Sequence, residues 1–192
     1  MKKFLAVLLS VALLLGCMNA ALANPSITKL DITVVSIEPL TELPDGLTII
    51  VRPAEPDTYE SDKVAKIVKA MADKNNAITP ESLKEDLVLP EDVNLADYDF
   101  ITDFFDVVLV KDGAASFDLD GAPVSAKITF DVDALKGVAA DDLGSYSFLL
   151  INTATAEAQL LTIEGDSFVS EKGEVTVVFP FLGTFALVQK VA

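Results

Sequence analysis

The chain of 192 residues carries 30 Asp and Glu against 14 Lys and Arg, a formal net charge of −16. Phosphates of nucleic acids and anionic membrane surfaces repel so acidic a protein, so neither is an expected partner. With no histidine and one cysteine, the sequence holds no Ser-His-Asp triad, no Cys-His pair and no histidine-ligated zinc site.

The first 23 residues have the pattern of a secretory signal peptide. Two lysines precede an apolar run, 4–15. This run is too short to cross a bilayer as a helix, which takes about 20 residues. Ala21-Leu22-Ala23 then supplies the small residues that signal peptidase requires. We therefore predict cleavage after Ala23, no transmembrane span and a secreted or cell-envelope-associated bacterial protein.

A second processing site overlaps the first. Leu14-Leu15-Gly16-Cys17 resembles a bacterial lipobox, although Leu15 is bulkier than the small residue usual at that position. Cleavage there would leave Cys17, the only cysteine, at the N-terminus with a lipid anchor. Cleavage after Ala23 instead leaves 30 acids against 12 bases (14 less Lys2 and Lys3), a formal charge of −18.

Two strands are predicted in the N-terminal part. In 27–38, Leu30, Ile32 and Val34 alternate with polar residues, which is typical of a strand. In 43–53, a turn at Pro44-Asp45-Gly46 precedes an apolar β-branched run that Pro53 ends.

Two helices should follow these strands. In 61–76 Ser61 is a candidate N-cap, and apolar residues recur at helical spacing, as Val64, Ile67, Val68 and Met71. In 78–90, Thr79 is placed as N-cap and Pro80 at the first helical position, so a short second helix is expected to end before Pro90.

From residue 98 the pattern is that of an antiparallel β-sandwich. The stretch 123–133 alternates cleanly between apolar and polar residues, as a sheet with one solvated face requires. The predicted strands are 104–113 (ending in an Asp-Gly turn), 123–133, 146–153, 158–165, 173–180 and 183–190. The predicted sandwich core includes Val124, Ile128, Phe130, Leu149, Val177, Phe179, Phe185 and Leu187.

The fold class predicted from these elements is mainly β with a helical segment. A small α+β part, 24–97, precedes an antiparallel sandwich, 98–192, with the acidic stretch 90–99 between them. In the alternative, the strands at 28–37 and 47–52 complete the same sandwich.

Three stretches of the C-terminal half resemble β-sandwich modules that close secreted and cell-wall-associated proteins of Gram-positive bacteria. They are GAPVSAKITFDVDAL (121–135), YSFLLINTATAEAQLLTIEG (146–165) and GEVTVVFPFLGTFALV (173–188). Leu182-Gly183-Thr184 replaces the Ser or His that often precedes the last strand, and the usual Trp is missing. The resemblance implies a surface or accessory role and transfers no site residue.

Four aspartates form a hypothetical calcium site. Asp118 and Asp120 alternate before a Gly turn, and Asp131 and Asp133 repeat that spacing. Calcium takes six to eight oxygen ligands, which alternating carboxylates can supply. We favour the other interpretation, in which these acids are solvated turn residues and N-caps, because no twelve-residue calcium loop follows. No other metal or cofactor is expected.

Two further features have structural and functional interpretations. Arg52, the only arginine, is either a ligand clamp or, as we favour, a partner in a structural salt bridge. The phenylalanines either line a ligand groove or, as is usual at strand spacing, fill the core. They are Phe100, Phe104, Phe105, Phe130, Phe179, Phe181 and Phe185.

Together these patterns predict a non-catalytic surface or interaction module whose partner is an extracellular protein or polysaccharide. One alternative is a carbohydrate-active hydrolase, or its accessory domain, that uses a pair of carboxylates. Against it, the chain has no Trp and three Tyr, whereas sugar sites favour aromatic platforms. The other alternative is an adhesion module stabilised by calcium.

Overall fold

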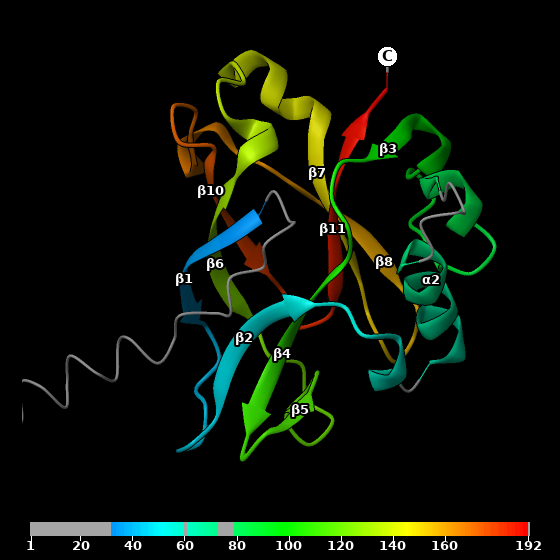
Figure 1. Cartoon of the computed structure of the whole chain (residues 1–192), viewed down its shortest axis with the longest axis vertical. Helices are drawn as coiled ribbons and strands as arrows, with labels where there is room; N and C mark the ends of the chain where they lie inside the picture. Colours follow the sequence, from blue (N-terminus) through cyan, green and yellow to red (C-terminus); the bar gives the residue numbers. More distant parts are fainter. Residues whose placement is uncertain (1–31, 60, 73–78, 192) are drawn as a thin grey trace, which may run out of the picture.

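The computed structural model describes residues 32–59, 61–72 and 79–191, and it shows two antiparallel sheets packed together (Figure 1). The predicted fold class is thereby confirmed. Residues 1–31, which include the predicted signal peptide, Cys17 and Leu30, lie outside the described ranges.

The first sheet has four strands in the order β1-β6-β10-β9. The alternation predicted for 123–133 is confirmed, because Val124 and the inward residues of β6 are all fully buried. On the opposite face of this sheet, the hydroxyls of Thr129 on β6 and Thr176 on β10 form a hydrogen bond between the two strands. The strands are β1 (Ile32–Pro39), β6 (Ala126–Val132), β9 (Phe168–Val169) and β10 (Glu174–Phe179).

The second sheet has seven strands, in the order β2-β4-β11-β7-β8 with β3 beside β11 and β5 beside β4. The predicted Asp-Gly turn is confirmed: Asp112 and Gly113 both have positive φ, 51° and 85°, as a two-residue hairpin turn requires. The strands are β2 (Thr48–Pro53), β3 (Tyr98–Phe100), β4 (Phe105–Lys111), β5 (Ala114–Ser116), β7 (Tyr146–Ile151), β8 (Ala158–Thr162) and β11 (Thr184–Lys190).

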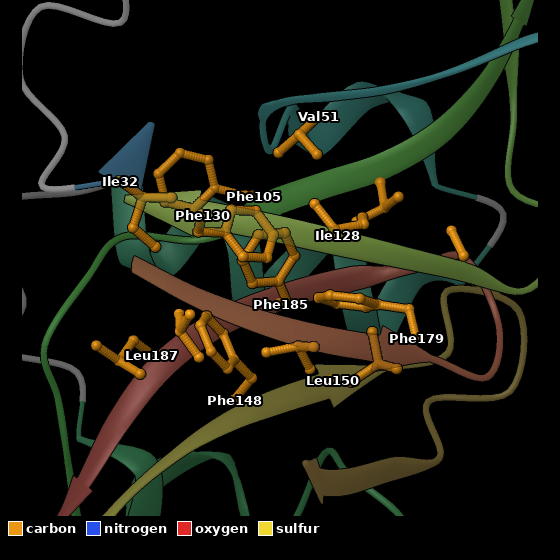
Figure 2. Packing of buried hydrophobic residues seen from close by; sticks show 14 of the residues in the cluster. Ile32, Val51, Phe105, Ile128, Phe130, Phe148, Leu150, Phe179, Phe185 and Leu187 are labelled. Carbon is orange, nitrogen blue, oxygen red and sulfur yellow. The ribbon is translucent and has the colours of Figure 1, made fainter. Parts of the chain in front are cut away.

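Phenylalanines fill the space between the two sheets (Figure 2). The ring of Phe130 lies 5.4 Å from that of Phe185, 5.6 Å from Phe148 and 6.1 Å from Phe179, measured between centroids. These are favourable distances for aromatic pairs. Of the predicted core, every residue is buried, and all except Leu149 belong to this cluster.

Leu149 belongs to a second core on the other face of the seven-stranded sheet. There α2 (Asp62–Ala72) buries Val64, Ile67 and Val68 in one cluster with Leu149 and Val188. The predicted amphipathic helix is thus confirmed within the described residues. Because β7 is buried on both faces, its apolar run does not show which face Leu149 occupies.

The predicted second helix, 78–90, is wrong in length and type. Pro80 does begin a helix, but this is the short 3-10 helix η2, after which the chain turns. Val88 then exchanges backbone hydrogen bonds with the chain around β8, from its N–H to Ala156 and from Ala158 to its carbonyl. Because Val88 makes these bridge-type hydrogen bonds, the last residues of the predicted helix cannot be helical. The 3-10 helices are η1 (Pro56–Thr58), η2 (Pro80–Leu83), η3 (Leu95–Asp97), η4 (Asp133–Leu135), η5 (Ala140–Ser145) and η6 (Gly165–Ser167).

The two N-terminal strands are parts of the sheets. β1 pairs with β6, and β2 pairs with β4, so each forms an edge of the sandwich. The early strands thus lie in the same sandwich as the later ones, as in the alternative given above. Each of the two sheets contains strands from both sides of residue 98.

Candidate functional site

The edge strands β1 and β2 of the two sheets lie on the same side of the molecule (Figure 1). Residues of both strands and of the loop between them line an apolar groove. Its volume of about 310 Å³ is at the lower end of the range of ligand sites in proteins, roughly 300–1,000 Å³. The groove is lined by Val34, Val35, Ser36, Ile37, Pro39, Leu43, Leu47, Thr48, Ile49 and Ile50.

A β-bulge in β1 shapes one wall of the groove. Val34 lies opposite Phe130 and Ser36 opposite Thr129, so Val35 is an extra residue without a partner in the register. The bulge lets Val34 and Ile37, three positions apart, both pack against the core between the sheets. Val35 is left 54% exposed.

The turn that the sequence predicts before β2 lies between two lining residues of the groove, Leu43 and Leu47. The Leu47 N–H donates to the carbonyl of Pro44 at 3.2 Å, and Gly46 has a φ of 82°. Such a turn needs a positive φ at its third residue, which glycine adopts without strain. Leu43 and Leu47, on either side of it, pack against the core and line the groove.

Acidic side chains border this groove. Glu38, Glu42 and Asp45 are exposed neighbours of its lining residues, and 32–51 contains no Lys or Arg. Lys127, exposed on β6, lies opposite Glu38 in the register. Lys127 offsets the charge of Glu38, and the remaining acids, Glu42 and Asp45, leave the surroundings of the groove negative and attractive to cations.

A buried polar cluster, which we call the Asp106 cluster, lies elsewhere, on the face of the seven-stranded sheet that α2 covers. Asp106 is fully buried and lies between its register partners Arg52 and Thr184. Its Oδ1 accepts hydrogen bonds from the Tyr59 hydroxyl at 2.7 Å and the Thr184 hydroxyl at 2.8 Å. The Glu55 backbone N–H also donates to its carboxylate.

Burial raises the pKa of Asp106 above its ordinary value, while its hydrogen bonds and the charge of Arg52 act in the opposite direction. Burial, and then the negative charge of Asp106, also raise the pKa of Tyr59. Tyr59 therefore stays protonated and donates its hydrogen bond to the carboxylate.

Arg52 forms the structural ion pair that we favoured from the sequence. Its Nε lies 3.8 Å from Oδ2 of Asp106, and its Nη1 lies 3.6 Å from Glu55. The Nε and Nη2 of Arg52 and the Oδ2 of Asp106 are buried without hydrogen-bond partners. Sequence reasoning missed Asp106, although one charge inside the apolar run 104–110 signals a buried polar group.

The four aspartates of the calcium hypothesis lie in two separate places. Asp118 accepts from the Gly121 N–H at 3.0 Å, and Asp120 has a φ of 53° in the following turn. At the other end of β6, Lys136 bonds both Asp131 and Asp133. Residues 126–130 of β6 lie between these two places, which corresponds to about 17 Å of strand.

Within the described ranges, no three Asp, Glu, His or Cys side chains lie close enough together to hold a metal ion. The hydrogen bond from Gly121 and the ion pairs with Lys136 instead give Asp118, Asp131 and Asp133 local structural contacts. Calcium binding by either pair stays a prediction.

Most of the phenylalanines proposed as groove or core residues are core residues. Phe104, Phe105, Phe130, Phe179 and Phe185 are buried, and Phe100 is half-buried beside Phe104. Phe181, in contrast, is half-buried and lines a cavity.

That cavity, of about 420 Å³, lies among the loops after β5, β7 and β10. Phe117 and Phe181 supply its aromatic surface, and Asn152 and Thr155 contribute polar groups. The side-chain oxygen of Asn152 already accepts from the N–H groups of Ala154 and Thr155, so it holds the shape of its own loop. We call this space the loop-end cavity.

Within the described part of the chain, no helix is both long enough and apolar enough to cross a membrane. Comparisons with protein-family models, with curated proteins and with solved structures find no match to this chain.

Proposed function

We propose that the chain is a non-catalytic interaction module that works outside the cytoplasm and holds its partner in the groove between β1 and β2. The groove itself carries this proposal, because its apolar walls reach the core and open to solvent beside exposed Val35. Concave, mostly apolar surfaces are the usual form of binding sites in proteins.

The chemistry of the lining supports binding rather than catalysis. Ser36 and Thr48 supply the only side-chain polar groups among the lining residues. Such walls offer shape and apolar area but no group that could transfer a proton at neutral pH. The Asp106 cluster does contain an acid, yet its carboxylate is fully buried under Tyr59 and joins two layers of the fold.

Export is the second part of the proposal. The signal peptide pattern of residues 1–23 and the resemblance to Gram-positive surface modules support it. Mass spectrometry of the mature protein tests it: an N-terminus at Asn24 indicates release, and a lipid-modified Cys17 indicates anchoring. A chain that keeps Met1 would contradict export.

A substitution at the groove tests the interaction. Val35→Gln replaces an exposed apolar side chain, so the fold should tolerate it. Val178→Gln is the matched control, since Val178 is 51% exposed and does not line the groove. We expect bacterial cell-envelope preparations to retain the wild type and the control but not Val35→Gln. Equal retention of all three would contradict a role for the groove.

A second candidate function is that of a carbohydrate-binding accessory domain, which the loop-end cavity favours through Phe117 and Phe181. A panel of polysaccharides separates the two. Binding that Phe181→Ala abolishes and Val35→Gln leaves unchanged would favour this candidate. Hydrolysis that one Asp or Glu substitution abolishes would instead support the alternative of a hydrolase.

A further inference from the structure

We propose that the occupant of the groove is an extended polypeptide segment of a partner protein, in which branched apolar residues alternate with Lys or Arg, and that it adds as a strand to the exposed edge of β1. This inference rests on the proposed function and names the partner's chemistry.

The free strand edges favour a polypeptide. In the described part of the chain, β1 pairs only with β6 and β2 only with β4, so each presents unpaired backbone N–H and C=O groups at its outer edge. An extended peptide can pair with such an edge. An acyl chain would fill the apolar walls but leave the backbone groups without partners.

The dimensions of the groove favour a short segment. Its β1 wall extends from Val34 to Pro39, which corresponds to about 20 Å of strand and a partner of roughly six residues. Since successive side chains of a strand point to opposite faces, every second residue of the partner would enter the groove. The bulge at Val35 bends the edge at the Val34 end of this wall and so disfavours pairing that continues beyond Val34.

The acidic border of the groove indicates which charge the other side chains of the partner segment have. Those that do not enter the groove would lie near its acidic border, where Glu42 and Asp45 are exposed. Lys or Arg at these positions would be attracted, and acidic residues would be repelled. A second copy of this chain would bring the same acids together on a mature molecule of formal charge −18 (30 acids against 14 less 2 bases), so we expect a different protein as partner.

Blocked synthetic peptides test this chemistry on the full mature chain. The probe alternates Val and Lys, and its binding is followed by fluorescence anisotropy and by NMR shifts of the backbone amides. The controls replace Lys by Glu, replace Val by Ser, or N-methylate alternate backbone nitrogens. We expect the Val/Lys peptide to shift the amides of β1 and each control to bind at least about tenfold more weakly.

Protein variants locate the site. Val35→Gln should weaken the binding of the Val/Lys peptide about tenfold, whereas Val178→Gln should not change it. The double substitution Glu42→Gln and Asp45→Asn should weaken binding and reduce its dependence on salt. Asp141→Asn with Asp142→Asn is the matched control, because both acids are exposed on η5, outside the groove.

Three results would overturn the inference. The Ser/Lys peptide could bind as well as the Val/Lys peptide, which would show attraction by charge alone. The N-methylated peptide could bind undiminished, which would exclude strand addition. A fatty acid could bind at the groove while no peptide does. If Val35→Gln still abolishes retention by cell envelopes in these cases, the proposed function stands and only the partner's chemistry is wrong.

Discussion

The Tyr59 hydroxyl lies 2.7 Å from Oδ1 of Asp106 and so ties the segment between η1 and α2 to the middle of the seven-stranded sheet. Tyr59 also stacks on Phe117, with ring centroids 5.8 Å apart, beyond the end of β5. One side chain thus joins the helical layer, the sheet and the rim of the loop-end cavity. The Asp106 cluster is therefore best explained as a structural device that fixes how these layers dock.

Tyr59→Phe should lower the free energy of unfolding by about 1–3 kcal/mol, because it leaves a buried acceptor of Asp106 with one fewer donor. The apolar ring and its stacking on Phe117 are kept. Urea unfolding measures the loss. Tyr146→Phe is the matched control, since Tyr146 is another half-buried tyrosine, on β7, outside the Asp106 cluster. Equal effects of the two substitutions would argue against the bond to Asp106.

The loss of unfolding free energy that Asp106→Asn causes, relative to wild type, should become smaller as the pH rises. The pKa of Asp106 is raised in the folded protein, so the folded state holds its proton more tightly than the unfolded chain does. The stability that Asp106 contributes is fully present below the unfolded pKa of about 3.9, and it is lost as the pH rises through the folded pKa. The Asn side chain does not titrate, so the stability of Asp106→Asn does not fall in this way as the pH rises.

Urea unfolding of wild type and Asp106→Asn across acidic to neutral pH measures the difference. Asp103→Asn, which removes an exposed acid in the preceding segment, is the matched control. If the wild type instead gains stability over Asp106→Asn as the pH rises, the ion pair with Arg52 outweighs burial, and the direction of the pKa shift is wrong.

Local sequence patterns predicted most of this fold. Each of these patterns depends only on the conformation of its own segment. They are the alternation that ends at Val132, the helical spacing from Val64 to Val68 and the Asp112-Gly113 turn. The strands β3, β5 and β9 were missed because two or three residues are too few to show a period.

The two sites depend on pairings between distant segments, which no local pattern encodes. The groove exists because β1 and β2 join different sheets, through β6 and β4. The Asp106 cluster exists because residues 52, 106 and 184 fall into one register. Thr184, which donates to Asp106, belongs to the Leu182-Gly183-Thr184 stretch that departs from the resemblance to Gram-positive modules.

Phe130→Ala should cost about 3–5 kcal/mol of unfolding free energy, the usual penalty for emptying an aromatic core site. Phe130 is fully buried, and its ring packs against three other phenylalanine rings between the sheets (Figure 2). Denaturant unfolding measures the cost. Val169→Ala, at a 45% exposed site on β9, should stay within about 0.5 kcal/mol of wild type. A loss below about 1 kcal/mol for Phe130→Ala would place the ring outside the core.

Gly183→Ala should destabilise the protein by about 1–3 kcal/mol, because the sheet leaves no room for the added methyl group. A Cβ at Gly183 would lie 2.4 Å from the carbonyl oxygen of Ile151 on β7. The carbonyl of Gly183 also accepts from the Val107 N–H at 2.9 Å, so relief of the clash would disturb the contact between β4 and β11. The neighbouring Thr184 donates a hydrogen bond to Asp106, so a displaced backbone at residue 183 should also change the pH dependence of stability.

Gly165→Ala is the matched control for this substitution. Nothing lies within 4 Å of a Cβ at Gly165, which begins η6. A glycine replaced by alanine without strain stabilises a protein slightly, by about 0.4–1 kcal/mol, because the unfolded chain loses freedom. Thermal unfolding should therefore shift in opposite directions for the two variants. If Gly183→Ala were as stable as Gly165→Ala, β11 and β7 could not be packed as closely as the backbone contact at Ile151 requires.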